Sequence, residues 1–282
     1  MKVQKKLAIA YARTKLNLLT LVHTRSAGKE AYRLFCTPLV RYTGKPGATF
    51  QSGQARSFQL NDQWIRGTEC NPGGKKTLLI LHGFSSSYHK FDHLAAAFVE
   101  KDYRVLAFDA PAHGVSDGKM VNALDYSNMI KEIMRLFGPV DFFIAHSFGG
   151  LALSLALEAV PHNASVKVVL IAPATETTTA MTDALKFLQV SNPRTKEALA
   201  QHIVTISGNG PEWFSIRRAI RNIQAKVLWI HDEEDFITPV SDVLKVQEDH
   251  PPHVEFYFTQ GLGHQKIYRD AEVKEKIIKF LE

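Results

Sequence analysis

The hydrophobic pattern of this 282-residue chain alternates between two periods from residue 75 onward. Short apolar runs, typical of buried strands, are each followed by a longer segment with helical spacing. The predicted strands are residues 77–81, 104–108, 140–144, 166–171, 226–230 and 254–258, and the predicted helices are 91–101, 122–137, 151–157, 239–249 and 271–281. Strands alternating with helices predict an α/β fold with a doubly wound, mostly parallel sheet, which binds ligands at the carboxyl ends of its strands.

The chain before residue 75 has a different pattern. Residues 57–60 and 63–68 flank Asn61-Asp62 and predict an antiparallel hairpin that opens the sheet. Residues 2–25 predict an amphipathic helix, with an apolar face of Leu7, Tyr11, Leu18, Leu21 and Val22 opposite Lys2, Lys6, Arg13, Asn17 and Thr20. Such a helix packs on its own domain, covers a pocket, pairs with another subunit or lies on an anionic membrane surface, and the pattern leaves these alternatives open.

Residues 173–224 interrupt the alternation of strands and helices. They place about 50 residues between consecutive strands, and a connection of this length in a compact domain usually has a function. We therefore predict a helical lid over the strand ends at 173–224. The remainder divides into an N-terminal basic helical extension at 1–50 and a core at 51–172 and 225–282.

The net charge of +6 is distributed unevenly. Residues 1–76 carry 14 Lys and Arg side chains against three acidic ones, and the rest of the chain is acidic on balance. A basic segment of this kind is compatible with nucleic-acid binding, but no RNA- or DNA-binding motif accompanies it. We expect no nucleic-acid partner, and we keep membrane contact or dimerisation through residues 2–25 as alternatives.

The two cysteines, Cys36 and Cys70, form no metal-binding pattern and no disulfide framework, which indicates a reducing compartment or a protein indifferent to redox conditions. The basic residues near the start resemble a signal peptide, but the apolar run ends at Arg13, shorter than such peptides need. No apolar run reaches the roughly 18 residues of a membrane span. We expect a cytoplasmic protein that retains its first residues, with peripheral membrane contact as the alternative.

The most informative stretch is residues 140–157, VDFFIAHSFGGLALSLAL. An apolar strand leads directly into a helix, and small residues at Ala145 and Gly149 flank Ser147. A strand that reverses into a helix this abruptly leaves no room for larger side chains, and it holds the serine hydroxyl clear of the sheet. Ala145 stands where glycine is commoner. The pattern predicts a nucleophilic serine at position 147.

A nucleophilic serine needs a base, and the base needs an acid to orient it. Asp235 follows the predicted strand 226–230, and His264 follows the last predicted strand. Both therefore lie at the sheet edge that carries Ser147. For the oxyanion that forms during acyl transfer, we predict the backbone N–H groups of Phe84, after strand 77–81, and of Phe148.

These segments together resemble the α/β-hydrolase superfamily. The resemblance covers residues 57–282 and is carried by HGF at 82–84, FDAPAHGVSDG at 108–118, AHSFGG at 145–150, HDEEDFITP at 231–239 and GLGH at 261–264. It implies an eight-stranded sheet with a small cap, and a Ser-Asp-His hydrolase acting on carboxylic esters or thioesters. It also implies a second location for the acid, at Glu176, and mainly structural roles for Asp109, His113, Gly114 and Ser116.

The remaining residues indicate no other chemistry. His82 and His146 are expected in the oxyanion turn and in packing, and no His and carboxylate spacing indicates a metal. No phosphate-binding glycine motif is present, so we expect neither cofactor nor metal. Trp213 and Phe214 line an acyl pocket or form the core of the lid. The predicted function is hydrolysis of a small-molecule acyl substrate; acyl transfer, or a non-catalytic ligand-binding or scaffold protein of the same fold, are the alternatives.

Overall fold

The computed structural model describes residues 2–282, with side chains from residue 6 onward. The predicted basic positions Lys2 and Lys5 therefore lie outside the described side chains. The chain divides into two compact units. One, here the helical unit, comprises Met1–Thr37 and Glu176–Ser215, and the other, here the α/β unit, comprises Pro38–Thr175 and Ile216–Glu282.

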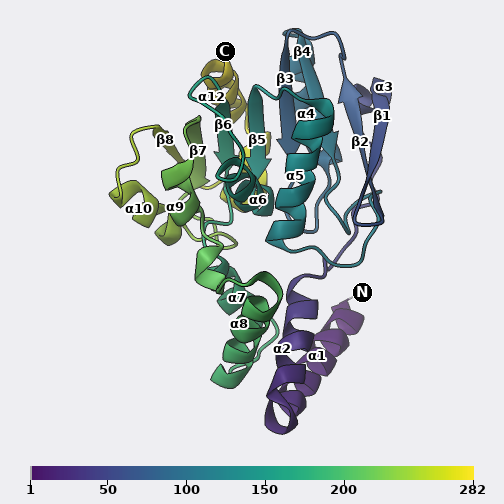
Figure 1. Ribbon diagram of the computed structural model, residues 1–282, viewed down its shortest axis with the longest axis vertical. Coiled ribbons are helices and arrows are strands. Elements are labelled where there is room, and N and C mark those ends of the chain that lie inside the picture. The colour runs from purple at the N-terminus through teal and green to yellow at the C-terminus, as the bar shows by residue number, and fades with distance from the viewer. Residues whose placement is uncertain (1) are drawn as a thin grey trace. The chain divides into compact units, whose positions relative to one another are not determined.

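The α/β unit is built on one eight-stranded sheet in the order β1-β2-β4-β3-β5-β6-β7-β8 (Figure 1). The strands are β1 Gln54–Leu60, β2 Gln63–Cys70, β3 Lys76–Leu81, β4 Tyr103–Phe108, β5 Phe142–His146, β6 Lys167–Ile171, β7 Lys226–Asp232 and β8 Val254–Thr259. β1 and β2 form the predicted hairpin, β2 pairs with β4 antiparallel, and all later pairs are parallel. The predicted fold class is confirmed.

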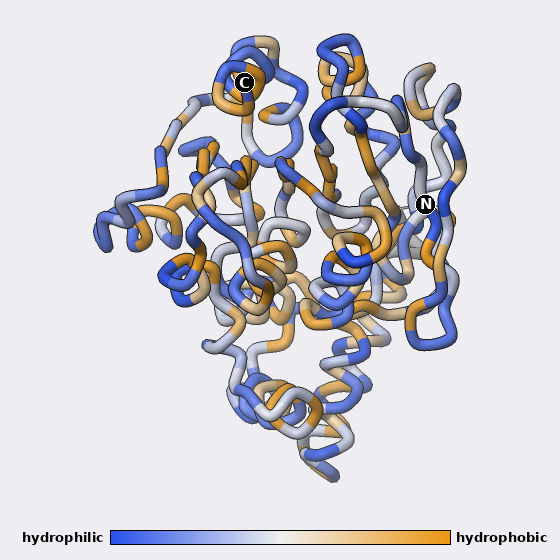
Figure 2. The backbone as a smooth tube through the Cα atoms, turned by 45° about the horizontal axis from the view of Figure 1, so that its top comes forward, coloured by the Kyte–Doolittle hydropathy of each residue, from blue (hydrophilic) through white to orange (hydrophobic). Residues whose placement is uncertain are grey.

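The helices of this unit connect the strands. They are α3 Ala48–Ser52, η1 Tyr88–Phe91, α4 Asp92–Val99, α5 Ala123–Phe137, α6 Phe148–Leu157, α9 Ile216–Ala219, η3 Ile220–Asn222, α10 Val240–Glu248, α11 Gly263–Lys266, η4 Ile267–Arg269 and α12 Ala271–Leu281. The central strand β5 is buried at every position, as expected for a parallel strand covered by helices on both faces. Figure 2 shows orange hydrophobic and blue hydrophilic stretches alternating along the backbone.

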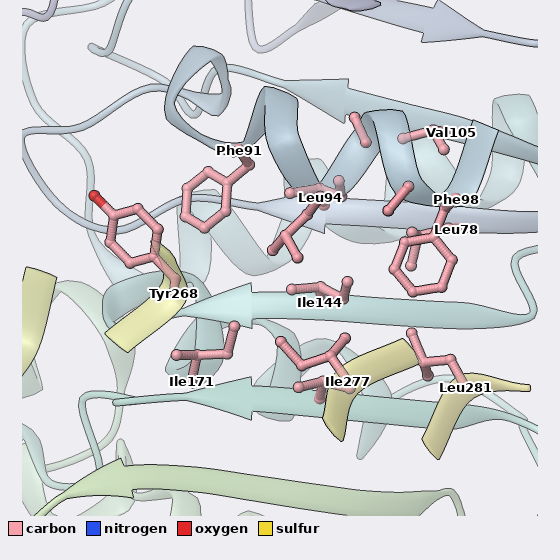
Figure 3. Packing of buried hydrophobic residues seen from close by; sticks show 14 of the residues in the cluster. Leu78, Phe91, Leu94, Phe98, Val105, Ile144, Ile171, Tyr268, Ile277 and Leu281 are labelled. Atoms are coloured by element: carbon pink, nitrogen blue, oxygen red, sulfur yellow. The ribbon is translucent and has the colours of Figure 1, made fainter. Parts of the chain in front are cut away.

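Helices α4 and α12 cover one face of the sheet, and a hydrophobic core fills the space between these helices and the strands (Figure 3). Phe91 and Leu94 from one side and Ile277 from the other pack against strand residues such as Ile144, and all four are fully buried. The burial of these side chains fixes the sheet rigidly beneath the loops that follow the strands.

The helical unit contains α1 Lys2–Val22, α2 Thr24–Phe35, α7 Thr177–Phe187, α8 Pro193–Ser207 and η2 Pro211–Trp213. α2 packs closely against α8 at Gly28, where there is no room for a side chain. A Cβ atom on Gly28 would lie 2.3 Å from the carbonyl oxygen of Ala198. The rings of Tyr32 and His202 meet edge to face nearby. We predicted the N-terminal extension and the lid as separate parts, but the structure groups residues 1–37 with 176–215, and it groups 38–50 with the sheet.

The predicted helix at 2–25 is two helices, because His23 ends the first and caps the second by accepting a hydrogen bond from the Ser26 N–H. α1 packs within its unit through Ala12, Leu16 and Thr20, which are buried. The Thr20 hydroxyl lies 2.8 Å from that of Thr195 on α8. The predicted polar face is therefore partly the packed face, and the predicted apolar face points away from it.

Across residues 2–282, none of the helices is both long enough and apolar enough to traverse a bilayer.

Candidate active site

Ser147 occupies the sharp turn between β5 and α6. Its backbone has φ of 54° and ψ of −121°, a conformation that is strained for a residue with a side chain. The Ser147 carbonyl accepts hydrogen bonds from the N–H groups of Gly150 and Ala174, which hold the turn in place. A Cβ atom on Gly149 would lie 2.7 Å from the His82 carbonyl oxygen, so only glycine fits there. Ala145, by contrast, is fully buried inside β5, and the turn forms without a glycine at that position.

The structure brings the three predicted side chains into one hydrogen-bonded chain. The Oγ atom of Ser147 lies 3.0 Å from Nε2 of His264. Nδ1 of His264 lies 2.7 Å from Oδ2 of Asp235. The carboxylate fixes the proton on Nδ1, which leaves Nε2 free to accept the proton of the serine hydroxyl.

Hydrogen-bond donors surround the carboxylate of Asp235. Its Oδ1 accepts hydrogen bonds from the N–H groups of Ile237 and Thr238, and its Oδ2 accepts from the Thr238 hydroxyl and from His264. Burial by itself raises the pKa of this carboxyl, but the hydrogen bond and charge of His264 and the backbone donors outweigh burial and lower the pKa to about 2. Asp235 is therefore ionised at neutral pH.

The lowered pKa of Asp235 predicts a stability change in acid. A carboxyl whose pKa is lower in the folded state stabilises the fold above its unfolded value near 3.8, and that stabilisation is lost as the pH falls towards 2. We expect the difference in the free energy of unfolding between the wild type and Asp235→Asn to decrease by about 2 kcal/mol as the pH falls from 5 to 2. Urea unfolding of both proteins at several pH values in this range measures the difference. If the difference in the free energy of unfolding stays constant with pH, the lowered pKa of Asp235 is contradicted.

His264 lies in α11, and Asp232 holds the segment that precedes this helix. Oδ2 of Asp232 accepts hydrogen bonds from the Leu262 N–H and from the Thr259 hydroxyl, which lie before His264 in the chain. From the other side, Nε2–H of His146 donates to the His264 carbonyl oxygen at 3.0 Å. Asp232, the last residue of β7, thus links the loop that carries the acid to the segment that precedes the base.

Thr238, Asp232 and His146 support the three predicted residues, and the sequence prediction did not assign them these functions. The only signal for Thr238 and Asp232 was their position in the segment HDEEDFITP. His146 was expected in packing, and it is buried against Tyr268 with its ring centroid 4.7 Å from that of His264.

One predicted oxyanion donor, Phe84, follows β3, and the other, Phe148, begins α6. Phe148 is the first residue of α6, so its N–H has no partner within the helix. Among residues 2–282, no hydrogen-bond acceptor is recorded for the N–H of Phe84 or of Phe148. The two rings meet edge to face at 5.6 Å. A Cβ atom on Gly83 would lie 2.9 Å from the Cβ of Ser147, so the backbone before Phe84 passes directly beside the serine.

The loop of Phe84 is held by two neutral histidines. Nε2 of His113 accepts a hydrogen bond from the Ser85 N–H, and Nε2 of His82 accepts one from the Ala110 N–H. Burial lowers the pKa of His82 to about 4 and that of His113 to about 3. Both rings therefore act as fixed hydrogen-bonding groups, as the resemblance implied for His113.

The rest of the FDAPAHGVSDG segment shapes the same loop. Asp109 accepts a hydrogen bond from the Val115 N–H, and the Ser116 hydroxyl donates to the Asp109 carbonyl. A Cβ atom on Gly114, which has a φ of +43°, would lie 1.8 Å from the Asp109 carboxylate. These contacts are structural, in agreement with the expectation from the resemblance.

Glu176, the alternative acid, belongs to the helical unit, where it accepts a hydrogen bond from the Ser215 hydroxyl. Phe214 is buried in the same unit, with the Trp213 ring against it at 5.0 Å. Within residues 2–282 no group of three or more His, Cys, Asp or Glu side chains could hold a metal ion.

Known proteins resemble parts of this chain in sequence. The family model described as serine aminopeptidase, S33, matches residues 73–211, which include Ser147. An uncharacterized abhydrolase domain-containing protein of Dictyostelium discoideum is 29% identical over 93 residues, 31% of this chain and 10% of that protein. The chain spans half the length or less of the curated relatives it matches.

Solved structures resemble the chain over more of its length. An esterase of Pyrococcus furiosus superposes with a TM-score of 0.65 at 21% identity, covering 87% of this chain and 97% of the esterase. The thioesterase domain from the curacin biosynthetic pathway gives a TM-score of 0.59 at 16% identity, over 80% of this chain and 99% of that domain. At these identities the likeness establishes the fold.

Proposed function

We propose that this chain is a serine hydrolase of the α/β-hydrolase superfamily that cleaves a carboxylic ester or thioester through an acyl-enzyme. The serine aminopeptidase family model that matches residues 73–211 and the fold shared with solved esterases support this proposal. The observation that carries the proposal is the continuous hydrogen-bonded chain from Ser147 through His264 to Asp235. Packing alone does not require a buried serine to adopt a strained backbone conformation or to hydrogen-bond to a histidine that an aspartate orients. These features therefore support a nucleophilic role for Ser147.

In the proposed reaction, Oγ of Ser147 attacks the acyl carbonyl carbon while Nε2 of His264 takes the hydroxyl proton. Asp235 stabilises the imidazolium that forms. The N–H groups of Phe84 and Phe148 donate to the oxyanion of the tetrahedral intermediate. As the intermediate collapses, His264 gives the proton to the leaving alcohol or thiol, and a water molecule then hydrolyses the acyl-enzyme by the same steps.

The same three side chains are compatible with more than one leaving group and acyl acceptor. The matched family model is named for a serine aminopeptidase, and the same three side chains would attack an amide. Acyl transfer to an alcohol or thiol in place of water also uses the same acyl-enzyme. A non-catalytic receptor of this fold would bind a ligand without turnover.

Two measurements on the wild-type protein test the proposal. A fluorophosphonate probe should label the protein once, and digestion should locate the label on the peptide that contains Ser147. A panel of esters and thioesters of increasing acyl length, with an aminoacyl anilide added, should show turnover with an initial burst. Absence of labelling and of turnover across the panel would rule out the hydrolase, whereas labelling with turnover only of the anilide would reassign the substrate class.

A further inference from the structure

The net positive charge of the protein resides in the helical unit. That unit carries 11 Lys and Arg side chains against five Asp and Glu. The α/β unit carries 23 of each, so its net charge is zero. The charge of +6 is therefore a property of the helices alone, and it marks a surface that attracts anions.

The helical unit also exposes a row of large apolar side chains on α1. This row, the α1 stripe, consists of Leu7, Tyr11, Leu18, Leu21 and Val22, whose exposed fractions range from 58% to 83%. Positions 7, 11 and 18 are spaced by one and by two helical turns, so they follow one side of the helix. The opposite side, through Ala12 and Leu16, makes the packing contacts of the unit. The stripe contributes nothing to the fold, and its contiguous apolar area indicates a binding surface.

Several cations of α1 and α2 are available to a partner. Lys15 and Arg33 are engaged by Glu30. Lys6, Arg25 and Lys29 are exposed, and in the described part of the chain no acidic side chain lies within ion-pair distance of them. An amphipathic helix with a large exposed apolar face, in a unit with an excess of cations, is the kind of element that binds the interface of an anionic bilayer.

We propose that the helical unit docks on an anionic lipid surface, with the α1 stripe inserted among the acyl chains and the cations of α1 and α2 at the level of the phosphates. A second copy of this chain is a poorer occupant, because it would bring two units of the same net charge of +6 together. A neutral bilayer would leave the cations without counter-charges. The inference goes beyond the proposed hydrolysis and does not depend on it.

Co-sedimentation of the full chain with vesicles tests this proposal. Vesicles of phosphatidylcholine alone are compared with vesicles containing about 30% phosphatidylserine, at low and at high salt. We expect binding to the anionic vesicles, weakened by salt. The variant Leu7→Asn/Leu18→Asn/Leu21→Asn should bind at least tenfold more weakly. Arg25→Gln/Lys29→Gln should lose about 20-fold on anionic vesicles, because each cation near such a surface contributes roughly fivefold.

A matched control is Val115→Asn/Leu136→Asn, which removes two exposed apolar side chains from the α/β unit. Its vesicle binding should equal that of the wild type, and circular dichroism should show that all variants are folded. Equal binding of the wild type to neutral and anionic vesicles, or no binding to either, would overturn the proposal. So would a dimer in sedimentation equilibrium that the α1 stripe variant dissociates, since that result assigns the stripe to a second copy. Turnover of a soluble ester, measured separately, reports on the hydrolase proposal alone.

Discussion

Replacing Ser147 with alanine is expected to lower kcat for ester hydrolysis by about 10⁵- to 10⁶-fold, because no other group would form the acyl-enzyme. The change removes one oxygen atom, whose hydrogen-bond partner in the described part of the chain is His264. The fold should therefore persist, with an unfolding midpoint close to that of the wild type. Pre-steady-state kinetics with an activated ester measures the effect, and the initial burst should vanish together with the steady-state rate.

Ser154→Ala is the matched control for this experiment. Ser154 lies on α6, two turns after Ser147, and its hydroxyl donates to the Gly150 carbonyl within the same helix. Its loss should leave kcat within a few-fold of the wild type. If Ser147→Ala kept more than about 1% of the activity, the nucleophile would have to be sought elsewhere.

Asp235→Asn has the second-largest expected effect, a loss of about 10⁴-fold in kcat. Asparagine keeps the size of the side chain, and its carbonyl oxygen can still accept the hydrogen bonds from the N–H groups of Ile237 and Thr238. The amide group would instead present N–H to Nδ1 of His264, which stabilises the wrong tautomer and no longer stabilises the imidazolium. KM should change little, since no substrate contact is altered.

Two further variants locate the acid. Glu234→Gln changes an exposed neighbour in the same loop and should keep nearly full activity. Glu176→Gln removes the alternative acid and should remain within about tenfold of the wild type. Loss of activity in Glu176→Gln, with retention in Asp235→Asn, would transfer the role of the acid to Glu176.

The sheet and the sharp turn at Ser147 could be predicted because both depend on short-range patterns. A strand buried on both faces is mostly apolar, as residues 142–145 are, and a tight strand-to-helix turn requires small residues nearby. The order of the motifs at successive strand ends then placed Ser147, Asp235 and His264 at one edge, because parallel strands end on the same side of the sheet. The hydrogen bonds among them agree with this placement.

The supporting residues could not be predicted in the same way. Nothing in the local sequence separates Thr238, whose hydroxyl donates to Asp235, from an ordinary surface threonine. The role of Asp232 depends on a loop 30 residues further along the chain. The contact between Asp232 and Thr259 arises from the register of β7 against β8, which brings these two residues opposite each other. Register depends on how the buried faces of both strands match, so the pattern of one strand alone does not determine it.

The sequence by itself determined the fold class and the three residues proposed for catalysis, because each depends on patterns within a few residues or on chain order. Only the tertiary structure decided which side of the N-terminal helix packs. The helix carries apolar residues on two sides, and its sequence cannot say which side packs. α2 packs closely against α8, with Gly28 against Ala198, and residues 1–37 form one compact unit with residues 176–215. The packed side of α1 is Ala12, Leu16 and Thr20, and the larger apolar side chains of the α1 stripe are left exposed.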